Sequence, residues 1–460
     1  MRKKLLSGVI FFLLLFLSVS VQGEERKVSL TVYNQDLALV KEMRELSFES
    51  GRNEIKFTEV AEKIDPTSVH FQILNLADKV FLLEQNYQYD LVSSDKILEK
   101  YLDKKIQILT NGGKLYEGEL LSFSSDNFSL KEKEGSIRIL NRAEIVDLLF
   151  PSLPEGLITR PTLVWRLDSK IKGKQEAEVS YLTTGINWHA EYVAVVDKED
   201  KALELSGWVS IDNRSGATYP EAKLKLIAGE VHRVVERGPI RTMYKGAEAE
   251  MALGMAPPPT FEEKPFFEYH LYTLQFPSTV KDNEIKQISL FPSTSVKVNK
   301  IYTYDGAREA KKVKVNLEFL NSKEEGLGIP LPKGKLRVYK EDVDKSLEFV
   351  GEDLIEHTPK DEKIRVYLGD AFDIVGERSR TDFKRISDDV SEESYQVKLR
   401  NHKEEKVEVI VVEHLYPYTN WEILESNFKY EKKDANTIEF KIPIEKNQEQ
   451  IVNYKVRYVS

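Results

Sequence analysis

The sequence contains no cysteine among its 460 residues. This absence excludes a disulfide framework, a thiolate metal site, a cysteine nucleophile and lipidation of an N-terminal cysteine. Methionine is also rare, with five residues, and the seven histidines are scattered along the chain. Apart from a run near the N-terminus, no apolar segment is long enough to span a bilayer. The folded part of the chain must therefore be stabilised by packing.

The usual catalytic and cofactor motifs are missing as well. Gly326-Leu-Gly328 lacks the third glycine and the opening helix of a phosphate-binding loop. There is no His-Glu-x-x-His zinc motif and no serine in a Gly-x-Ser-x-Gly turn. We therefore expect no cofactor and no metal, and a non-catalytic role is favoured over an enzyme.

The N-terminus has the pattern of a signal peptide. Three basic residues at positions 2–4 precede the apolar run Leu5–Leu17, and small residues lead to Gly23. We predict a signal peptide at 1–23 and an exported protein, periplasmic or extracellular. The alternative is an uncleaved membrane anchor, because the run extended through Val21 approaches the roughly 18 residues that can span a bilayer.

The charge balance argues against nucleic acid as a partner. The chain has 67 basic and 76 acidic residues, and removing 1–23 takes away three basic residues and no acidic ones. The mature net charge is therefore 64 minus 76, or −12. An acidic exported protein is a poor ligand for nucleic acid or for an anionic lipid surface, and no integral membrane domain is expected after cleavage.

The fold class predicted is mainly β, with several antiparallel β-sandwiches of immunoglobulin-like type. Short strands separated by turns fill an N-terminal β domain at 24–90 and a large region at 156–460, which can hold two sandwiches. Pro151, Pro154, Gly156 and Pro161 mark the boundary before the second region. Residues 237–267 lack periodicity and are predicted to be a flexible insertion.

Residues 91–155 have a different pattern, a helix followed by five short strands. The helix is expected at Ser94–Lys104, and Asn111-Gly112-Gly113 predicts a hairpin turn. This segment resembles the Sm-like or SH3-like small barrel. Sm proteins bind RNA through an aspartate and an asparagine where Asp126 and Asn127 stand, together with an arginine–glycine pair. Here Ala143 follows Arg142, so we interpret the module as structural or protein-binding.

Val179–Val231 is predicted to be a three-stranded antiparallel meander. Apolar residues from Leu203 to Ile211 alternate with polar ones and Trp208, the period-two pattern of a strand with one buried face. Strands ending at Val196 and Ala228 are expected on either side, joined by turns at 198–201 and 213–216.

Several segments resemble an uncharacterised exported family that includes the mucoidy inhibitor A proteins. They are Tyr181–Tyr192, Leu205–Asn213, Ala228–Val231, Glu268–Leu274, Gly328–Gly334 with Arg337–Tyr339, and Gly369–Asp373. The resemblance covers most of 161–460, and the small barrel stands where many relatives carry a coiled coil. It implies an exported protein of unknown function and carries over no catalytic residue, although the family name suggests envelope polysaccharide.

The outward face of the meander offers a candidate binding site. Alternation places Trp208 on one face with Glu204 and Asp212, and His189 and Glu191 are expected on the same face of the preceding strand. An aromatic plane beside carboxylates and hydroxyls is what sugar stacking and hydroxyl recognition require. The alternatives are that another domain covers Trp208 and that His189 and Glu191 form an ordinary exposed polar pair.

A second set of carboxylates supports a rival function. Asp370, Asp373 and Glu377 have the chemistry of an acid–base pair or of hard metal ligands, as do Asp342 and Asp344. Ordinary turn carboxylates, paired with Arg378 and Arg380, are the favoured interpretation. The prediction is an exported binding or structural protein of the cell envelope whose partner is a glycan or another envelope protein. The alternative is an envelope hydrolase, metal-assisted or not, that uses Asp370 and Asp373 or His189 and Glu191.

Overall fold

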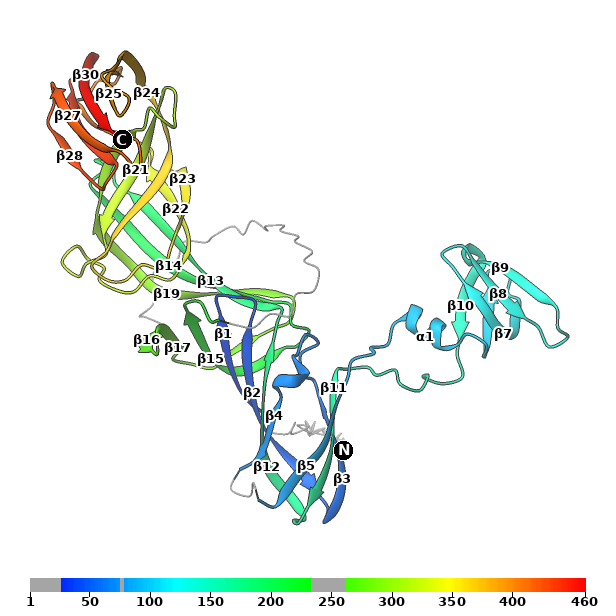
Figure 1. Cartoon of the computed structure of the whole chain (residues 1–460). Coiled ribbons are helices and arrows are strands. Elements are labelled where there is room, and N and C mark those ends of the chain that lie inside the picture. The colour runs from blue at the N-terminus through cyan, green and yellow to red at the C-terminus, as the bar shows by residue number, and fades with distance from the viewer. Residues whose placement is uncertain (1–25, 75–77, 233–260) are drawn as a thin grey trace, which may run out of the picture. The chain divides into compact units, whose positions relative to one another are not determined.

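The structure is a computed structural model that describes residues 26–74, 78–232 and 261–460 (Figure 1). The predicted signal peptide at 1–23 and most of the predicted insertion at 237–267 lie outside these residues. The last part of that insertion was predicted wrongly, because Phe261–Phe266 form strand β16, which pairs with β17 (Tyr269–Leu274). The sequence of β16 contains Pro265 and a run of charged residues, so it lacks the alternation of apolar and polar residues that predicts a strand.

The predicted fold class is confirmed, since the described chain is mainly β and builds several multi-stranded sheets. It divides into two compact units. Among the described residues, unit 1 comprises 26–29, 40–74 and 78–182, and unit 2 comprises 30–39, 183–232 and 261–460. The domain boundaries expected from the sequence stay a prediction.

Unit 1 contains a three-stranded antiparallel sheet in the order β3–β11–β5, and strands β2, β12 and β4 are neighbours in a second sheet. The bounds are β2 Ala38–Phe48, β3 Gly51–Thr58, β4 His70–Ile73, β5 Val80–Gln88, β11 Thr162–Ser169 and β12 Gly173–Thr183. Trp165 is buried between the rings of Phe57 and Phe71, and its indole N–H donates to Gln85. A turn of 3-10 helix, Pro66–Ser68, precedes β4.

The helix-plus-five-strand module lies within unit 1. Helix α1 spans Ser94–Lys100, shorter than predicted, and its N-cap is Ser93, whose hydroxyl accepts from the Lys96 amide. The sheet order is β10–β6–β7–β8–β9. Gly118 is needed because a Cβ there would lie 2.8 Å from the carbonyl oxygen of Lys131. The strands are β6 Lys105–Thr110, β7 Leu115–Phe123, β8 Asn127–Lys131, β9 Ile137–Asn141 and β10 Ile145–Leu149, with a 3-10 turn at Arg142–Glu144.

Unit 2 contains a five-stranded sheet in the order β19–β14–β13–β22–β23. Strands β13 and β22 run parallel, and the other pairs are antiparallel. A second sheet in unit 2 has β16, β17, β15 and β1 as successive neighbours, with β18 beside β15. The strands are β1 Lys27–Tyr33, whose residues from Leu30 belong to unit 2, β13 Ile186–Val196, β14 Ala202–Asn213, β15 Tyr219–Ala228, β18 Ser278–Val280, β19 Glu284–Lys297, β22 Gly334–Glu341 and β23 Leu347–Ile355.

The predicted pairing of the third strand of the meander was wrong. β13 and β14 form the expected antiparallel hairpin, but β14 continues to β19, whereas β15 pairs with β17 and β18. The reason lies at the end of β14, where buried Asn213 donates to the carbonyls of Ala217 and Lys281 and accepts from the Ser215 amide. These bonds bind the turn to a segment 68 residues away, so the chain leaves the sheet there. Neighbours in sequence need not pair in space.

The nine-stranded sheet of unit 2 has the order β27–β30–β25–β24–β21–β20–β26–β29–β28 and folds over itself as a sandwich. Its core is formed by alternating residues of facing strands, among them Val397, Val409, Phe440 and Val456. Asn401, at the end of β25, repeats the role of Asn213 by donating to Glu405 and Glu445 carbonyls. The strands are β20 Asn299–Tyr304, β21 Lys312–Leu320, β24 Lys363–Arg385, β25 Val390–Asn401, β26 Val407–His414, β27 Asn420–Ser426, β28 Tyr430–Lys432, β29 Thr437–Ile444 and β30 Gln448–Val459.

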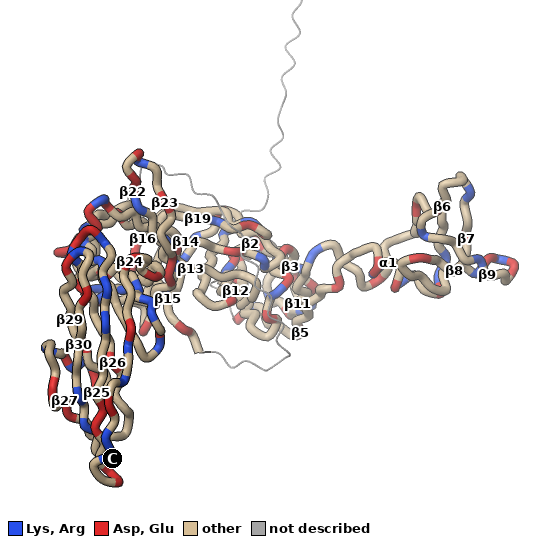
Figure 2. The backbone as a smooth tube through the Cα atoms, turned by 90° about the horizontal axis from the view of Figure 1, so that it is seen from above, with Lys and Arg blue, Asp and Glu red and all other residues tan. Residues whose placement is uncertain are grey.

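Acidic and basic residues are interspersed along the strands of both units (Figure 2). Many of them form cross-strand pairs, such as Lys363 with Glu318 at 3.0 Å and Arg166 with Glu84 at 2.9 Å. Exposed pairs of this kind contribute about 0–1 kcal/mol each. The charges therefore keep the outer faces of the sheets solvated rather than holding the fold together.

Candidate functional site

The β13–β14 hairpin carries the predicted binding face. Trp188 and Tyr192 of β13 point inward and are buried, and the Tyr192 hydroxyl donates to the Pro332 carbonyl at 2.7 Å. On the outward face, His189 lies opposite Ser210 and Glu191 lies opposite Trp208. Residues directly opposite each other in an antiparallel pair share a face. The prediction that His189 and Glu191 share a face with Trp208 is therefore confirmed.

Two irregularities in the pairing of β14 with β19 set the position of Trp208. The register shifts on both sides of Gly207, so that Gly207 is opposite Phe291 and Trp208 is opposite Ser289. A Cβ at Gly207 would lie 2.3 Å from the Phe291 ring. Glycine is thus required for the ring to pack beneath the strand. Bulges of this kind bend a strand and re-aim its side chains.

Trp208 is neither fully buried nor fully exposed. The indole N–H groups of Trp165, Trp188 and Trp421 each donate to a protein acceptor, at 2.9, 3.1 and 2.7 Å. No such acceptor for Trp208 is found in the described parts of the chain. Trp208 is therefore partly exposed, and its indole N–H is an available donor.

Beside Trp208, ionisable side chains form a row across three strands. His189 Nε2 lies 3.1 Å from Glu191 Oε1, and the other Glu191 oxygen accepts from Arg337 of β22. Arg337 Nε in turn lies 3.2 Å from Glu352 of β23. Burial raises the pKa of Glu191, but the hydrogen bond from His189 and the charge of Arg337 outweigh it, so the pKa lies below its usual value. Glu191 is therefore ionised and holds the side chains of His189 and Arg337 in place.

The sequence did not identify Arg337 or Glu352 as members of this face. Arg337 lies on β22, which reaches β13 by a parallel pairing over more than 130 residues of chain, with Val193 opposite Arg337, and Glu352 lies on β23, which pairs with β22. The alternation of Lys335, Arg337 and Tyr339 is visible in the sequence, but nothing local says which strand lies next to it. A parallel pairing between strands so far apart in sequence is visible only in the tertiary structure.

Glu204 and Asp212 share the face but not the immediate surroundings of Trp208. Each is four residues from Trp208 along β14, which is about 13 Å at strand spacing. Glu204 accepts from Ser293 at 3.2 Å, and Asp212 pairs with Arg214 at 3.0 Å. The polar groups nearer to Trp208 in register are Ser210, which accepts from Gln287 at 3.4 Å, and Ser289. The immediate surroundings of Trp208 on this face are thus serine, glutamate and arginine side chains.

The rival carboxylates Asp370 and Asp373 both line a cleft in unit 2. Asp370 pairs with Lys312 at 2.8 Å and accepts from the Tyr367 hydroxyl at 3.0 Å. The Lys312 ammonium, with Tyr367, holds the pKa of Asp370 below its usual value. Asp370 is therefore ionised at neutral pH and does not have the raised pKa of a general acid.

The other carboxylates of that set serve structural contacts. Glu377 pairs with Arg400 at 3.1 Å. The expected pairing of Arg378 and Arg380 with these nearby carboxylates was wrong, because they pair instead with Glu413 and Glu393 across the sheet. Glu377 and Arg378 are successive residues and point to opposite faces of the strand, whereas Arg378 and Arg380 share a face and meet the acids on that side. Asp342 and Asp344 lie in the β22–β23 turn, where each accepts from a backbone amide of that turn, as expected of turn carboxylates.

Among the described residues, no group of three or more histidine and acidic side chains is arranged to hold a metal ion. The same part of the chain contains no helix long and apolar enough to cross a membrane. Comparison with models of known protein families and with curated protein sequences found no match.

Proposed function

We propose that the protein is an exported, non-catalytic binding component of the cell envelope that contacts polysaccharide through the Trp208 face. The observation that supports this most directly is the partly exposed Trp208 side chain, whose indole N–H has no acceptor in the described chain, beside ionised and hydroxyl side chains. Sugar rings offer C–H surfaces to an aromatic plane and hydroxyls to carboxylates and guanidinium groups. The export signal and the resemblance to the exported family that includes the mucoidy inhibitor A proteins belong to the same proposal.

The charge row gives this face the rigidity that recognition requires. Arg337 is held by Glu191 and Glu352, and His189 is held by Glu191, so their donors are fixed before a ligand arrives. Side chains that are already ordered lose little entropy on binding. The alternative is an envelope hydrolase, metal-assisted or not, that uses Asp370 and Asp373 or His189 and Glu191.

The test is a binding assay with the purified full chain and purified envelope glycans: peptidoglycan, lipopolysaccharide and exopolysaccharide. Trp208→Ala should weaken binding by about 30-fold, because loss of a central aromatic contact costs about 2 kcal/mol. Trp208→Phe keeps a smaller aromatic plane and should lose less.

Trp421→Ala is the matched control, since Trp421 is a half-buried tryptophan on the nine-stranded sheet. It should bind like the wild type. Absence of glycan binding by the wild type, or equal loss in the two alanine variants, would refute the assignment. Circular dichroism of each variant separates loss of the site from loss of the fold.

A further inference from the structure

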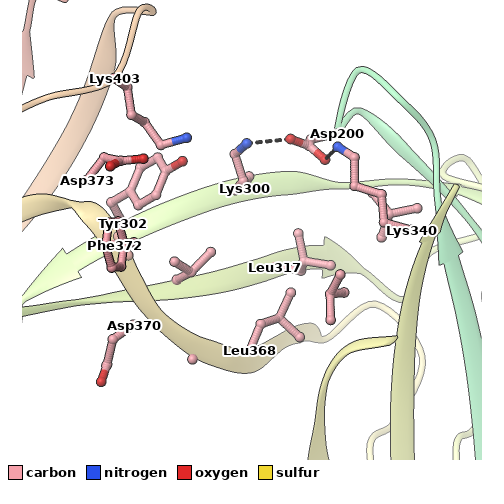
Figure 3. Close-up of a pocket in the computed structure, with 15 residues that line it drawn as sticks. Asp200, Lys300, Tyr302, Leu317, Lys340, Leu368, Asp370, Phe372, Asp373 and Lys403 are labelled. Atoms are coloured by element: carbon pink, nitrogen blue, oxygen red, sulfur yellow. Dashed lines mark hydrogen bonds and ion pairs between the residues drawn. The ribbon is translucent and has the colours of Figure 1, made fainter. Parts of the chain in front are cut away.

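A cleft of about 410 Å³ lies in unit 2, and none of its lining residues belongs to the Trp208 face described above. Strands β20, β21 and β24 form one wall, and the β13–β14 turn with β22 and β23 forms the other (Figure 3). Its volume falls in the range of small-molecule sites, roughly 300–1,000 Å³. Its lining combines an apolar floor with charged groups at the rim. The floor is made of Val196, Val315, Leu317, Val350 and Leu368.

A wide bulge in β24 shapes one end of the cleft. Lys314 pairs with Asp370 and Lys312 pairs with Val375, so the four residues 371–374 stand opposite Val313 alone. The bulge is held on both sides, by Asp370 with Lys312 and by the Asp373 carbonyl, which accepts from the His402 amide at 2.8 Å. Phe372 at its tip is 96% exposed. Bulges are common beside binding sites. Exposure of the Phe372 ring to water at the rim of the cleft is unfavourable, and such exposed apolar surface often marks a binding site.

Three lysines face the cleft. Lys300 and Lys340 each bind one oxygen of Asp200, which lies in the β13–β14 turn. Lys403 lies at the other end, and its ammonium and that of Lys300 are 6.0 and 5.9 Å from the centroid of the Tyr302 ring. A lysine ammonium has three donors, and Asp200 uses one from Lys300. Lys300 therefore keeps donors for a further acceptor.

The lining carries three lysines and three aspartates, so its formal charge is balanced. Asp370 points away from the lysines toward Lys312, which leaves Asp200 and Asp373 facing them (Figure 3). Lys403 also pairs with Glu405 at 3.4 Å, and an anion bound to Lys403 would compete with that carboxylate. Figure 3 places Lys300 between the Asp200 end and the end formed by Tyr302, Asp373 and Lys403. The space between Lys300 and Lys403, above the Tyr302 ring, is where one anionic group would meet two ammonium groups.

We propose that this cleft binds an amphiphilic anion: a carboxylate or phosphate head held between Lys300 and Lys403, with an apolar body against Tyr302, Phe372 and the apolar floor. The same head-and-tail chemistry occurs in free alkyl acids and in membrane lipids. The site is separate from the Trp208 face and does not depend on the function proposed for it.

The experiment is calorimetric titration of the full chain with decyl phosphate below its micelle concentration. Decanol and decyltrimethylammonium serve as uncharged and cationic analogues. Decyl phosphate should bind, and both analogues should bind at least tenfold more weakly. Lys403→Gln should weaken decyl phosphate binding about tenfold or more, since it removes a charged hydrogen bond without disturbing Asp200. Phe372→Ser should weaken it severalfold, and Asp373→Asn should strengthen it because a neighbouring negative charge is removed.

Lys441→Gln is the matched control, because Lys441 lies on β29 and pairs with Glu431, outside the cleft. It should bind like the wild type, as should Trp208→Ala. Vesicles containing phosphatidylglycerol form the second arm: binding to them with the same dependence on Lys403, but no binding of decyl phosphate, assigns the anion to a lipid headgroup. No binding in either arm, equal binding of decanol and decyl phosphate, or no effect of Lys403→Gln would overturn the proposal.

Discussion

Removing the Arg378 guanidinium should open the nine-stranded sheet. Glu413 has no exposed side-chain surface, and Arg378 Nε lies 3.1 and 2.9 Å from its two oxygens. The Tyr454 hydroxyl donates to the same carboxylate, and the guanidinium stacks 4.0 Å above the centroid of the Tyr395 ring. Arg378→Met keeps most of the aliphatic volume but leaves Glu413 as a buried charge without a cation.

The expected cost is about 3–5 kcal/mol, the range for breaking a buried ion pair by removing one partner. Burial raises the pKa of Glu413, against the lowering effects of Arg378 and Tyr454. Without Arg378 the pKa must rise further. Because a protonated Glu413 needs no cation, the variant should recover stability as the pH falls from 8 to 5. A carboxyl whose folded pKa is raised destabilises the fold only above its unfolded pKa.

Hydrogen exchange at the amides of β25, β26 and β30 measures the free energy of opening of this sheet separately from the rest of the chain. The predicted cost corresponds to a loss of protection of roughly 10²- to 10⁴-fold at pH 8. Adding Glu413→Gln to Arg378→Met should restore most of it, since the amide oxygen still accepts from Tyr454. Arg400→Met is the control, because Arg400 and Glu377 are partly exposed and their pair is worth about 0–1 kcal/mol.

Three results would refute this reasoning. One is a cost below about 1 kcal/mol for Arg378→Met, within the range of an exposed pair. Another is a cost that does not change with pH. The third is a double variant whose loss equals the sum of the two single losses, because coupled partners must deviate from additivity.

Two further predictions concern the strands that carry the sites. Gly334→Ala should destabilise unit 2 by about 1–3 kcal/mol and weaken glycan binding, because the new Cβ would lie 2.1 Å from the Ala190 carbonyl oxygen and push β22, with Arg337, away from β13. Gly112→Ala is the control: a Cβ there would have nothing within 4 Å, so this variant should melt like the wild type. Equal effects of the two substitutions on the melting temperature would contradict the argument. Lys455 and Arg457 lower the pKa of Glu392 to about 2. The ion pairs of Glu392 with these two residues should stabilise the β25–β30 pairing fully above pH 4.5 and lose that contribution as the pH falls toward 2. Glu392→Gln should therefore reduce the fall of the melting temperature between pH 4.5 and pH 2. An unchanged fall would exclude this role.

Much of the architecture follows from local patterns in the sequence. Alternation identified β14 and the inward side of β13, and it placed Trp208 on the outward face with His189 and Glu191. The turn residues of the small module predicted its five strands. Strands with mixed or interrupted patterns were missed, as with β5, whose exposed Phe81, Leu82 and Leu83 break the alternation, and β16. Local periodicity reports burial, and it is silent where a strand is not buried on one face.

The sequence by itself determined which side of each regular strand is apolar, because the period of two is fixed by the backbone. Only the tertiary structure decided which strands are neighbours. Asn213 turns β15 away from β14, the parallel β22 brings Arg337 to Glu191, and the β24 bulge sets Phe372 beside Lys403 and Tyr302. These contacts join residues tens to more than a hundred positions apart, and backbone pairing between strands carries no local signature of its partner. The aromatic residue of the candidate site could therefore be named from the sequence, whereas its charged partners and the lysine cleft could not.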